Sequence, residues 1–147
     1  MPQPGDTSAQ RHLGVAEIDE SDGSHLNLNP HYVVVNNIEV DHLNYYDDLD
    51  DIIGTMARFL NQNPRLKGVA LNCSDAGARA LIERLTPEVQ AKVISYGSDR
   101  ETTDALDMSA RSLVDEGLRV RFEAYAGEER LGEVCLKTPG SYNAENA

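Results

Sequence analysis

One stretch decides the fold class of this chain: residues 32–72, with the sequence YVVVNNIEVDHLNYYDDLDDIIGTMARFLNQNPRLKGVALN. It begins and ends with short apolar runs, and the three consecutive valines of the first run predict a central strand that is buried on both faces. Between the runs, apolar residues from Leu49 to Leu60 recur at spacings of three and four, which predicts a helix with one buried face. Strand, helix and strand in succession are typical of a parallel sheet with a crossover helix.

The same alternation continues on both sides of this stretch. Ahead of it, residues 13–18, LGVAEI, predict a further strand that is followed by a polar loop. After it, residues 75–85, DAGARALIERL, predict a second amphipathic helix with Asp75 as the N-cap, and residues 91–97, AKVISYG, predict a fourth strand. We therefore expect an α/β fold over residues 13–100, with a largely parallel sheet and flanking helices.

The sequence pattern changes after residue 100. In residues 101–138, apolar and polar side chains alternate in segments such as LRVRFEAY, and the dipeptides Glu116-Gly117 and Ala126-Gly127 are turn signals. This pattern predicts a small antiparallel meander that follows the parallel part of the sheet.

The length of 147 residues is enough for one domain with a hydrophobic core. Residues 1–12 are rich in Pro, Gly, Gln and Ser and have no apolar periodicity, so we expect a disordered leader. The expected domain then spans residues 13–147, of which residues 139–147 follow the meander.

Charge and composition restrict the classes of partner. The formal net charge of -12 disfavours nucleic acid and anionic membrane surfaces as partners. No apolar run approaches the roughly 20 residues of a membrane span, and no signal peptide is recognisable, so we expect a cytoplasmic protein. Cys73 and Cys135 lie in or beside apolar runs, which indicates core residues rather than a disulfide or a zinc site.

Polar side chains gather where two of the predicted strands end. In an open parallel sheet, ligands bind beyond the carboxyl ends of the strands. Carboxylate oxygens suit Mg²⁺, and the ion in turn neutralises phosphate charge. The pattern therefore predicts metal-assisted binding of an anion, although an acidic loop is also common as solvated surface and an Asp-His pair as a capped turn. The residues are Glu17, Asp19, Glu20 and Asp22 after the first strand, and Asn36, Asn37, Glu39, Asp41 and His42 after the second.

Four motifs are similar to those of a known family. Residues 15–30, VAEIDESDGSHLNLNP, and residues 34–48, VVNNIEVDHLNYYDD, resemble consecutive motifs of the middle domain of the Mur ligases, in the same order and spacing. Residues 93–97, VISYG, and residues 136–147, LKTPGSYNAENA, resemble two later motifs of that domain. The DESDGS form is most similar to the members that join L-alanine to UDP-N-acetylmuramate.

The resemblance implies an ATP-dependent ligase of peptidoglycan synthesis. Such a ligase phosphorylates the muramate carboxylate to an acyl phosphate, and the amine of L-alanine then forms the amide bond. The implied cofactors are ATP and Mg²⁺, and the implied partners are UDP-N-acetylmuramate and L-alanine, without nucleic acid or membrane. This reaction requires a crevice that holds the carboxylate and the γ-phosphate in line.

The resemblance also implies the residues that carry the reaction. Glu17 matches a metal-binding glutamate, and His42 matches a histidine that is assigned to a second magnesium ion. Asn37 matches an asparagine near the reacting groups, so that Asn37 and His42 make up the implied catalytic set.

Residues 139–147 resemble the start of the family's adenine-binding motif. Asn143 and Asn146 match two asparagines that face the adenine, where an amide can pair with a donor and an acceptor of the base. Tyr142 stands in place of a histidine; its ring can stack on a base, but it cannot copy the hydrogen bonding of an imidazole. Three other residues depart from the family pattern, namely Asn36, Asn44 and His25.

The sequence contains no G-K-T or G-K-S, so the family's phosphate loop is missing from it. We therefore expect a fragment or shortened form of the ligase that has most of the middle domain and is inactive in isolation, unless a separately encoded partner supplies the missing parts. Two other functions stay open. One is a non-catalytic module that binds a partner through an open sheet edge or regulates a complete ligase. The other is a piece of a related ligase with a different acid and amino acid.

Overall fold

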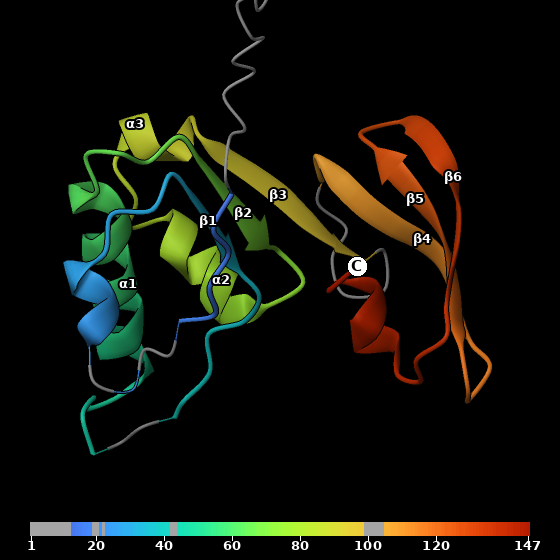
Figure 1. The fold of residues 1–147 in the computed structure, drawn as a ribbon, viewed down its shortest axis with the longest axis horizontal. Helices are drawn as coiled ribbons and strands as arrows, with labels where there is room; N and C mark the ends of the chain where they lie inside the picture. Colours follow the sequence, from blue (N-terminus) through green and yellow to red (C-terminus); the bar gives the residue numbers. More distant parts are fainter. Residues whose placement is uncertain (1–12, 19–20, 22, 42–43, 99–104) are drawn as a thin grey trace, which may run out of the picture.

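The computed structural model describes residues 13–18, 21, 23–41, 44–98 and 105–147. These residues form a six-stranded sheet whose strands lie side by side in chain order, from β1 at one edge to β6 at the other (Figure 1). The strands are β1 (Tyr32–Val35), β2 (Gly68–Asn72), β3 (Val93–Ser98), β4 (Met108–Asp115), β5 (Val120–Ala126) and β6 (Glu129–Leu136).

The sheet has a parallel part and an antiparallel part. Strands β1 to β4 pair in parallel, and β4 to β6 pair antiparallel. The predicted α/β fold with an antiparallel meander is thus confirmed. The connecting elements are η1 (Ser24–Asn27) before β1, α1 (Leu49–Gln62) between β1 and β2, α2 (Ala76–Ile82) and α3 (Pro87–Gln90) between β2 and β3, and η2 (Ser141–Ala144) after β6.

Helix α1 forms where the apolar spacing predicts it. The carboxylate of Asp48 caps its first turn by accepting a hydrogen bond from the N–H of Asp51 at 2.9 Å. At the other end, the side-chain amide of Asn63 donates to the carbonyl of Pro30 at 2.8 Å, which fastens the helix to the start of β1.

Neither α1 nor another helix in the described part of the chain is long and apolar enough to cross a membrane.

The main core lies between helices α1 and α2 and one face of β1–β3 (Figure 1). Leu60 of α1, Leu71 of β2 and Leu81 of α2 are completely buried there. Burial of each such side chain stabilises the fold by roughly 1.5–3 kcal/mol. This layer of two helices on three parallel strands is therefore the main source of hydrophobic stabilisation.

The opposite face of β1–β3 is largely uncovered by the described elements. Tyr32 and Val34 of β1 and Ile94 of β3 lie on this side, which we call the open face, and Val34 is 65% exposed. β1 is also the edge strand of the sheet. The prediction of a central strand buried on both faces is therefore wrong. β-branched residues favour a strand whether or not both faces are covered, so the valines predicted the strand but not its place.

The prediction of a strand at residues 13–18 is also wrong. These residues have no regular secondary structure, and Leu13 and Val15 are 83% and 88% exposed. A strand requires a neighbour whose backbone groups pair with its own, and no described strand pairs with this segment. Glu17 therefore does not stand at the carboxyl end of a strand in the described sheet.

The antiparallel part has a smaller core of its own. Ala110 of β4 and Val120 and Phe122 of β5 are buried together, and Ala144 of η2 packs against them. η2 lies on the side of the sheet opposite α1 and α2 (Figure 1). The last residues of the chain are thus placed beside the open face.

Candidate functional site

The carboxyl ends of β1, β2 and β3 lie at the same edge of the sheet because the three strands run in parallel. Asn36 and Asn37 follow β1 directly, and both are exposed. Asn72 ends β2, and Ser98 ends β3. Three neighbouring strands therefore deliver polar side chains to one place, as the sequence predicted for β1.

The chain after β1 is held in place by the first turn of α2. The carboxylate of Asp75 accepts hydrogen bonds from the N–H of Ala78 at 2.7 Å and from the N–H of Ile38 at 3.0 Å. The predicted N-cap is thus confirmed, and it also fixes the residue next to Asn37. Gly77 allows this contact, since a Cβ atom there would lie 2.3 Å from the carbonyl oxygen of Ile38.

The ends of β2 and β3 are joined by a network of hydrogen bonds. The side chain of Asn72 accepts from the N–H of Ser74 at 3.0 Å, and the hydroxyl of Ser74 accepts from the N–H of Ser98 at 2.9 Å. Asn72 and Ser98 are both buried. Their side chains therefore have fixed positions at this edge of the sheet.

Tyr96 connects β3 to the end of β1. Its hydroxyl donates to the side-chain oxygen of Asn36 at 2.8 Å. Burial, and next the negative charge of Glu145, raises the pKa of Tyr96 to about 12. The phenol is therefore neutral at physiological pH and acts as a hydrogen-bond donor.

The short turn η2 carries Tyr142 and Asn143, two of the residues that the sequence assigned to adenine, and Asn146 follows it. The ring of Tyr142 is 65% exposed, and the side-chain amide of Asn143 donates to the carbonyl of Pro139 at 2.7 Å, which leaves its oxygen available. Asn146 is exposed. Gly140 has a φ of 96°, and a Cβ atom there would lie 2.5 Å from the ring of Tyr142. The ring of Tyr142 and the amide of Asn143 therefore lie within η2, and the amide of Asn146 follows two residues after it.

Glu145 brings this turn to the ends of the strands. Its carboxylate accepts hydrogen bonds from the side-chain amide of Asn72 at 3.1 Å and from the hydroxyl of Ser98 at 2.9 Å. A largely apolar groove of about 330 Å³ lies between residues 144–147 and the sheet, and Tyr96 and Met108 line it. The structure thus places Tyr142, Asn143 and Asn146 at the edge where β2 and β3 end.

The predicted magnesium site is not assembled in the described residues. Within these residues, no group of three or more His, Cys, Asp or Glu side chains lies close enough to hold a metal ion. Glu17 is exposed in a segment without regular structure, and His42 lies outside the described residues, as do Asp19, Glu20 and Asp22. The described residues alone therefore do not fit a Mg²⁺ ion.

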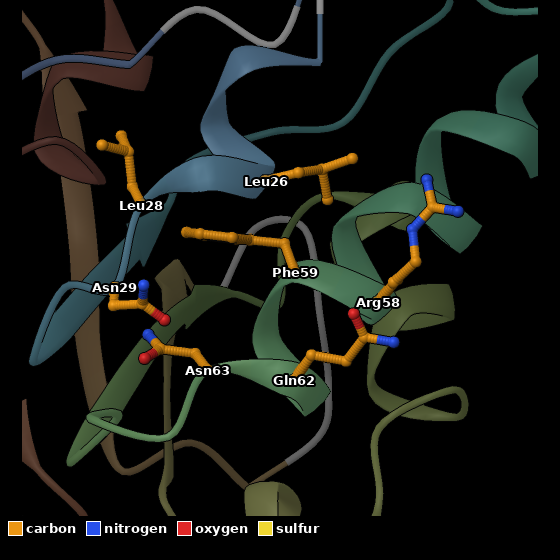
Figure 2. Close-up of a pocket in the computed structure, with 7 residues that line it drawn as sticks. All are labelled: Leu26, Leu28, Asn29, Arg58, Phe59, Gln62 and Asn63. Carbon is orange, nitrogen blue, oxygen red and sulfur yellow. The ribbon is translucent and has the colours of Figure 1, made fainter.

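A second pocket lies between η1 and the last turns of α1 (Figure 2). It has a volume of about 90 Å³, and the amide groups of Asn29 and Asn63 face each other across it (Figure 2). The side-chain amide of Asn63 donates a hydrogen bond to the carbonyl of Pro30, and Phe59 belongs to the main core. None of the predicted site residues lines this pocket, so we assign it a structural role.

Sequence reasoning missed four residues of the site, namely Asn72, Tyr96, Ser98 and Glu145. A signal was present for Asn72, because it follows the apolar run Val69–Leu71 at the end of a predicted strand, as Asn36 does after the valines. No comparable signal marked Glu145, which is an acidic residue in a short polar segment.

Two curated relatives are UDP-N-acetylmuramate–L-alanine ligases. The ligase of Syntrophotalea carbinolica is 40% identical over 134 residues, which are 90% of this chain and 27% of the relative. The ligase of Desulfatibacillum aliphaticivorans is 36% identical over 133 residues, with the same coverage of 90% and 27%. The chain therefore spans about a quarter of the length of the curated relatives that it matches.

A solved structure shares the fold, and a family model matches most of the chain. The crystal structure of UDP-N-acetylmuramate-alanine ligase from Thermotoga maritima has the same fold, with a TM-score of 0.64 at 19% identity over 87% of this chain and 26% of that one. The model of the Mur ligase middle domain matches residues 9–147. By the family model and the identity of 40% with the first relative, the chain belongs to the Mur ligase family and represents its middle domain.

Proposed function

We propose that this chain is the middle domain of an ATP-dependent ligase that joins L-alanine to UDP-N-acetylmuramate in peptidoglycan synthesis. The observation that carries the proposal is the identity of 40% over 134 residues with a ligase of that name. The DESDGS motif supports it, because its form is most similar to that of the alanine-adding members, and the NIEVDH motif supports the family.

In this proposal, the residues at the strand ends position the reacting groups. When bound, ATP supplies the phosphoryl group that activates the muramate carboxylate for attack by the amine of L-alanine. Tyr142 stacks on the adenine, and the amides of Asn143 and Asn146 pair with its edge. Asn37 stands at the end of β1, where its amide can donate a hydrogen bond to the reacting carboxylate or phosphate. Glu17 and His42 remain the proposed metal ligands, on the family resemblance alone.

We further propose that the chain has no ligase activity in isolation. The sequence has no G-K-T or G-K-S, so no lysine and backbone cradle of that type meets the β- and γ-phosphates. The net charge of -12 repels the triphosphate where no such cradle offsets it. Lost positioning alone costs on the order of 10⁵-fold in rate.

A second candidate function is a non-catalytic module that binds a partner strand. The observation that favours it is the edge position of β1, whose outer backbone groups pair with no other strand in the described sheet. An exposed edge accepts an added strand from another chain. The tyrosine at position 142, which departs from the family's histidine, also agrees with a relaxed requirement for nucleotide.

A chimera distinguishes the two functions. Residues 13–147 replace the matching segment of the Syntrophotalea carbinolica ligase, and product formation from ATP, UDP-N-acetylmuramate and L-alanine is measured. We expect measurable activity in the chimera, at least 100-fold less with Asn37→Ala, and none in the isolated chain. A folded chimera that forms no product, beside an active parent enzyme, would contradict the proposed ligase function and favour the binding module.

A further inference from the structure

We infer that Glu145 is a positioning residue: its carboxylate fastens the turn that carries Tyr142, Asn143 and Asn146 to the carboxyl ends of β2 and β3. The inference deepens the proposed function and rests on it in one respect, namely that the turn holds a nucleotide base. The fastening itself is a property of the structure and is tested separately below.

The two oxygens of the carboxylate bind donors from two different strands. One oxygen accepts from the side-chain amide of Asn72 at 3.1 Å, and the other accepts from the hydroxyl of Ser98 at 2.9 Å. A carboxylate is well suited to this place, because both of its oxygens accept hydrogen bonds and both partners here are donors. One side chain therefore ties the C-terminal turn to β2 and to β3 at once.

The two donors are themselves fixed. Asn72 and Ser98 are 6% and 2% exposed, and both belong to the network through Ser74 that joins β2 to β3. A carboxylate that binds buried, oriented donors is held more firmly than one that binds flexible surface groups. The anchor for the turn is thus the hydrogen-bonded ends of two parallel strands.

The turn needs such an anchor because it is short and has one buried side chain among its described residues. η2 has four residues, and its backbone is closed by the N–H of Glu145 and the N–H of Asn146, which both donate to the carbonyl of Tyr142 at 3.1 and 3.3 Å. Ala144 is that side chain, and it packs against β4 and β5. Without Glu145, we expect the ring of Tyr142 and the two amides to sample many orientations, which lowers the affinity for any ligand that they bind together.

Hydrogen exchange of the complete 147-residue chain tests the fastening without a ligand. Wild type, Glu145→Ala and Glu145→Gln are compared by NMR, with Glu129→Ala as a control at an exposed glutamate on β6. We expect the amides of residues 145 and 146 to exchange about tenfold faster in Glu145→Ala and the amide of Leu71 to keep its rate. Glutamine can accept from Asn72 and donate to Ser98, so Glu145→Gln should stay within about threefold of wild type. Unchanged exchange in Glu145→Ala would overturn the inference.

Nucleotide binding tests the consequence for the proposed site. The dissociation constant for Mg²⁺-ADP is measured by calorimetry for the same four proteins. We expect Glu145→Ala to bind about tenfold more weakly than wild type. The affinity of Glu145→Gln should lie within about threefold of wild type, and that of Glu129→Ala should equal it. Equal affinity of Glu145→Ala and wild type would overturn the positioning role. If wild type binds no nucleotide, the nucleotide-binding part of the proposed function fails for the isolated chain, while the exchange rates still decide whether Glu145 fastens the turn.

Discussion

The parallel and antiparallel parts of this sheet are stabilised in different ways. β1–β3 are covered on one face by α1 and α2, and the core between them includes three leucines that are completely buried. β4–β6 have no helix of that length upon them among the described residues, and their core is closed by the four residues of η2. The helices therefore stabilise one half of the sheet, whereas the hydrogen bonds between the strands and one short turn stabilise the other.

The largest expected effect is a loss of stability in the half of the sheet that the helices cover. Leu60→Ala removes a completely buried side chain from the contact between α1 and the sheet. We expect the free energy of unfolding to fall by about 3–5 kcal/mol, since the cavity adds to the lost transfer free energy. Urea unfolding followed by far-UV circular dichroism measures the change. Leu131→Ala, at a leucine that is 54% exposed on β6, is the control and should cost less than about 0.5 kcal/mol.

The matching change in the antiparallel half should cost less. Phe122 is buried, but it also lines the groove between the sheet and residues 144–147, so part of its surface has no packed neighbour. We expect Phe122→Ala to lower the free energy of unfolding by about 2–3 kcal/mol, at or below the low end of the usual range for phenylalanine. A loss greater than that of Leu60→Ala, measured by the same urea titration, would reverse the comparison of the two halves.

A third change tests the contact between α2 and the segment that follows β1. Gly77→Ala places a Cβ atom 2.3 Å from the carbonyl oxygen of Ile38, which is backbone and cannot rotate away. We expect a loss of about 1–3 kcal/mol in the same measurement. Gly54→Ala in the interior of α1 is the matched control, because its nearest neighbour is the flexible end of Arg84 at 3.6 Å. There the higher helix propensity of alanine should stabilise the protein by about 0.5–1 kcal/mol.

The smallest expected effect on stability concerns the contact between β3 and the start of β4, which we call the junction of the two halves. The carboxylate of Asp107, just before β4, accepts hydrogen bonds from the N–H and the hydroxyl of Ser95 in β3, both at 2.8 Å. The backbone hydrogen bond, and next the hydroxyl, lowers the pKa of Asp107 below its usual value. A lowered pKa means that the carboxylate stabilises the folded state above about pH 4, and that this stabilisation is lost as the pH falls through the folded-state pKa.

This junction can be tested by the pH dependence of the melting temperature. Between pH 7 and pH 3, wild type should lose more thermal stability than Asp107→Asn, since the variant has no carboxylate to protonate at this place. The effect should be small because Asp107 is exposed. Parallel curves for the two proteins would show that the junction does not depend on the charge.

Local signals predicted the helices, whereas the position of each strand was a non-local property. The spacing from Leu49 to Leu60 and the cap at Asp75 act within one turn or one helix, and α1 and α2 formed accordingly. The segment at residues 13–18 has the composition of a strand but pairs with no strand in the described sheet. For the valines of β1, the composition predicted the strand but could not tell an edge from the centre of the sheet.

The site was predictable only in part for the same reason. The family resemblance implied Asn37, Tyr142, Asn143 and Asn146, and the structure places the last three on one turn beside the strand ends. Glu145 escaped prediction because its partners, Asn72 and Ser98, lie 73 and 47 residues away in the sequence. Such contacts appear only when the sheet has brought the strand ends together.

The open face of β1–β3 has a consequence for the behaviour of the protein in solution. Two copies could approach through the exposed side chains of Tyr32 and Val34 and the free edge of β1, but each copy carries a net charge of -12. That repulsion extends over about 30 Å at 0.01 M salt and only about 10 Å at 0.1 M salt. Colloidal stability should therefore decrease as the ionic strength rises, and light scattering in a salt titration would reveal the apolar face as association that dilution reverses.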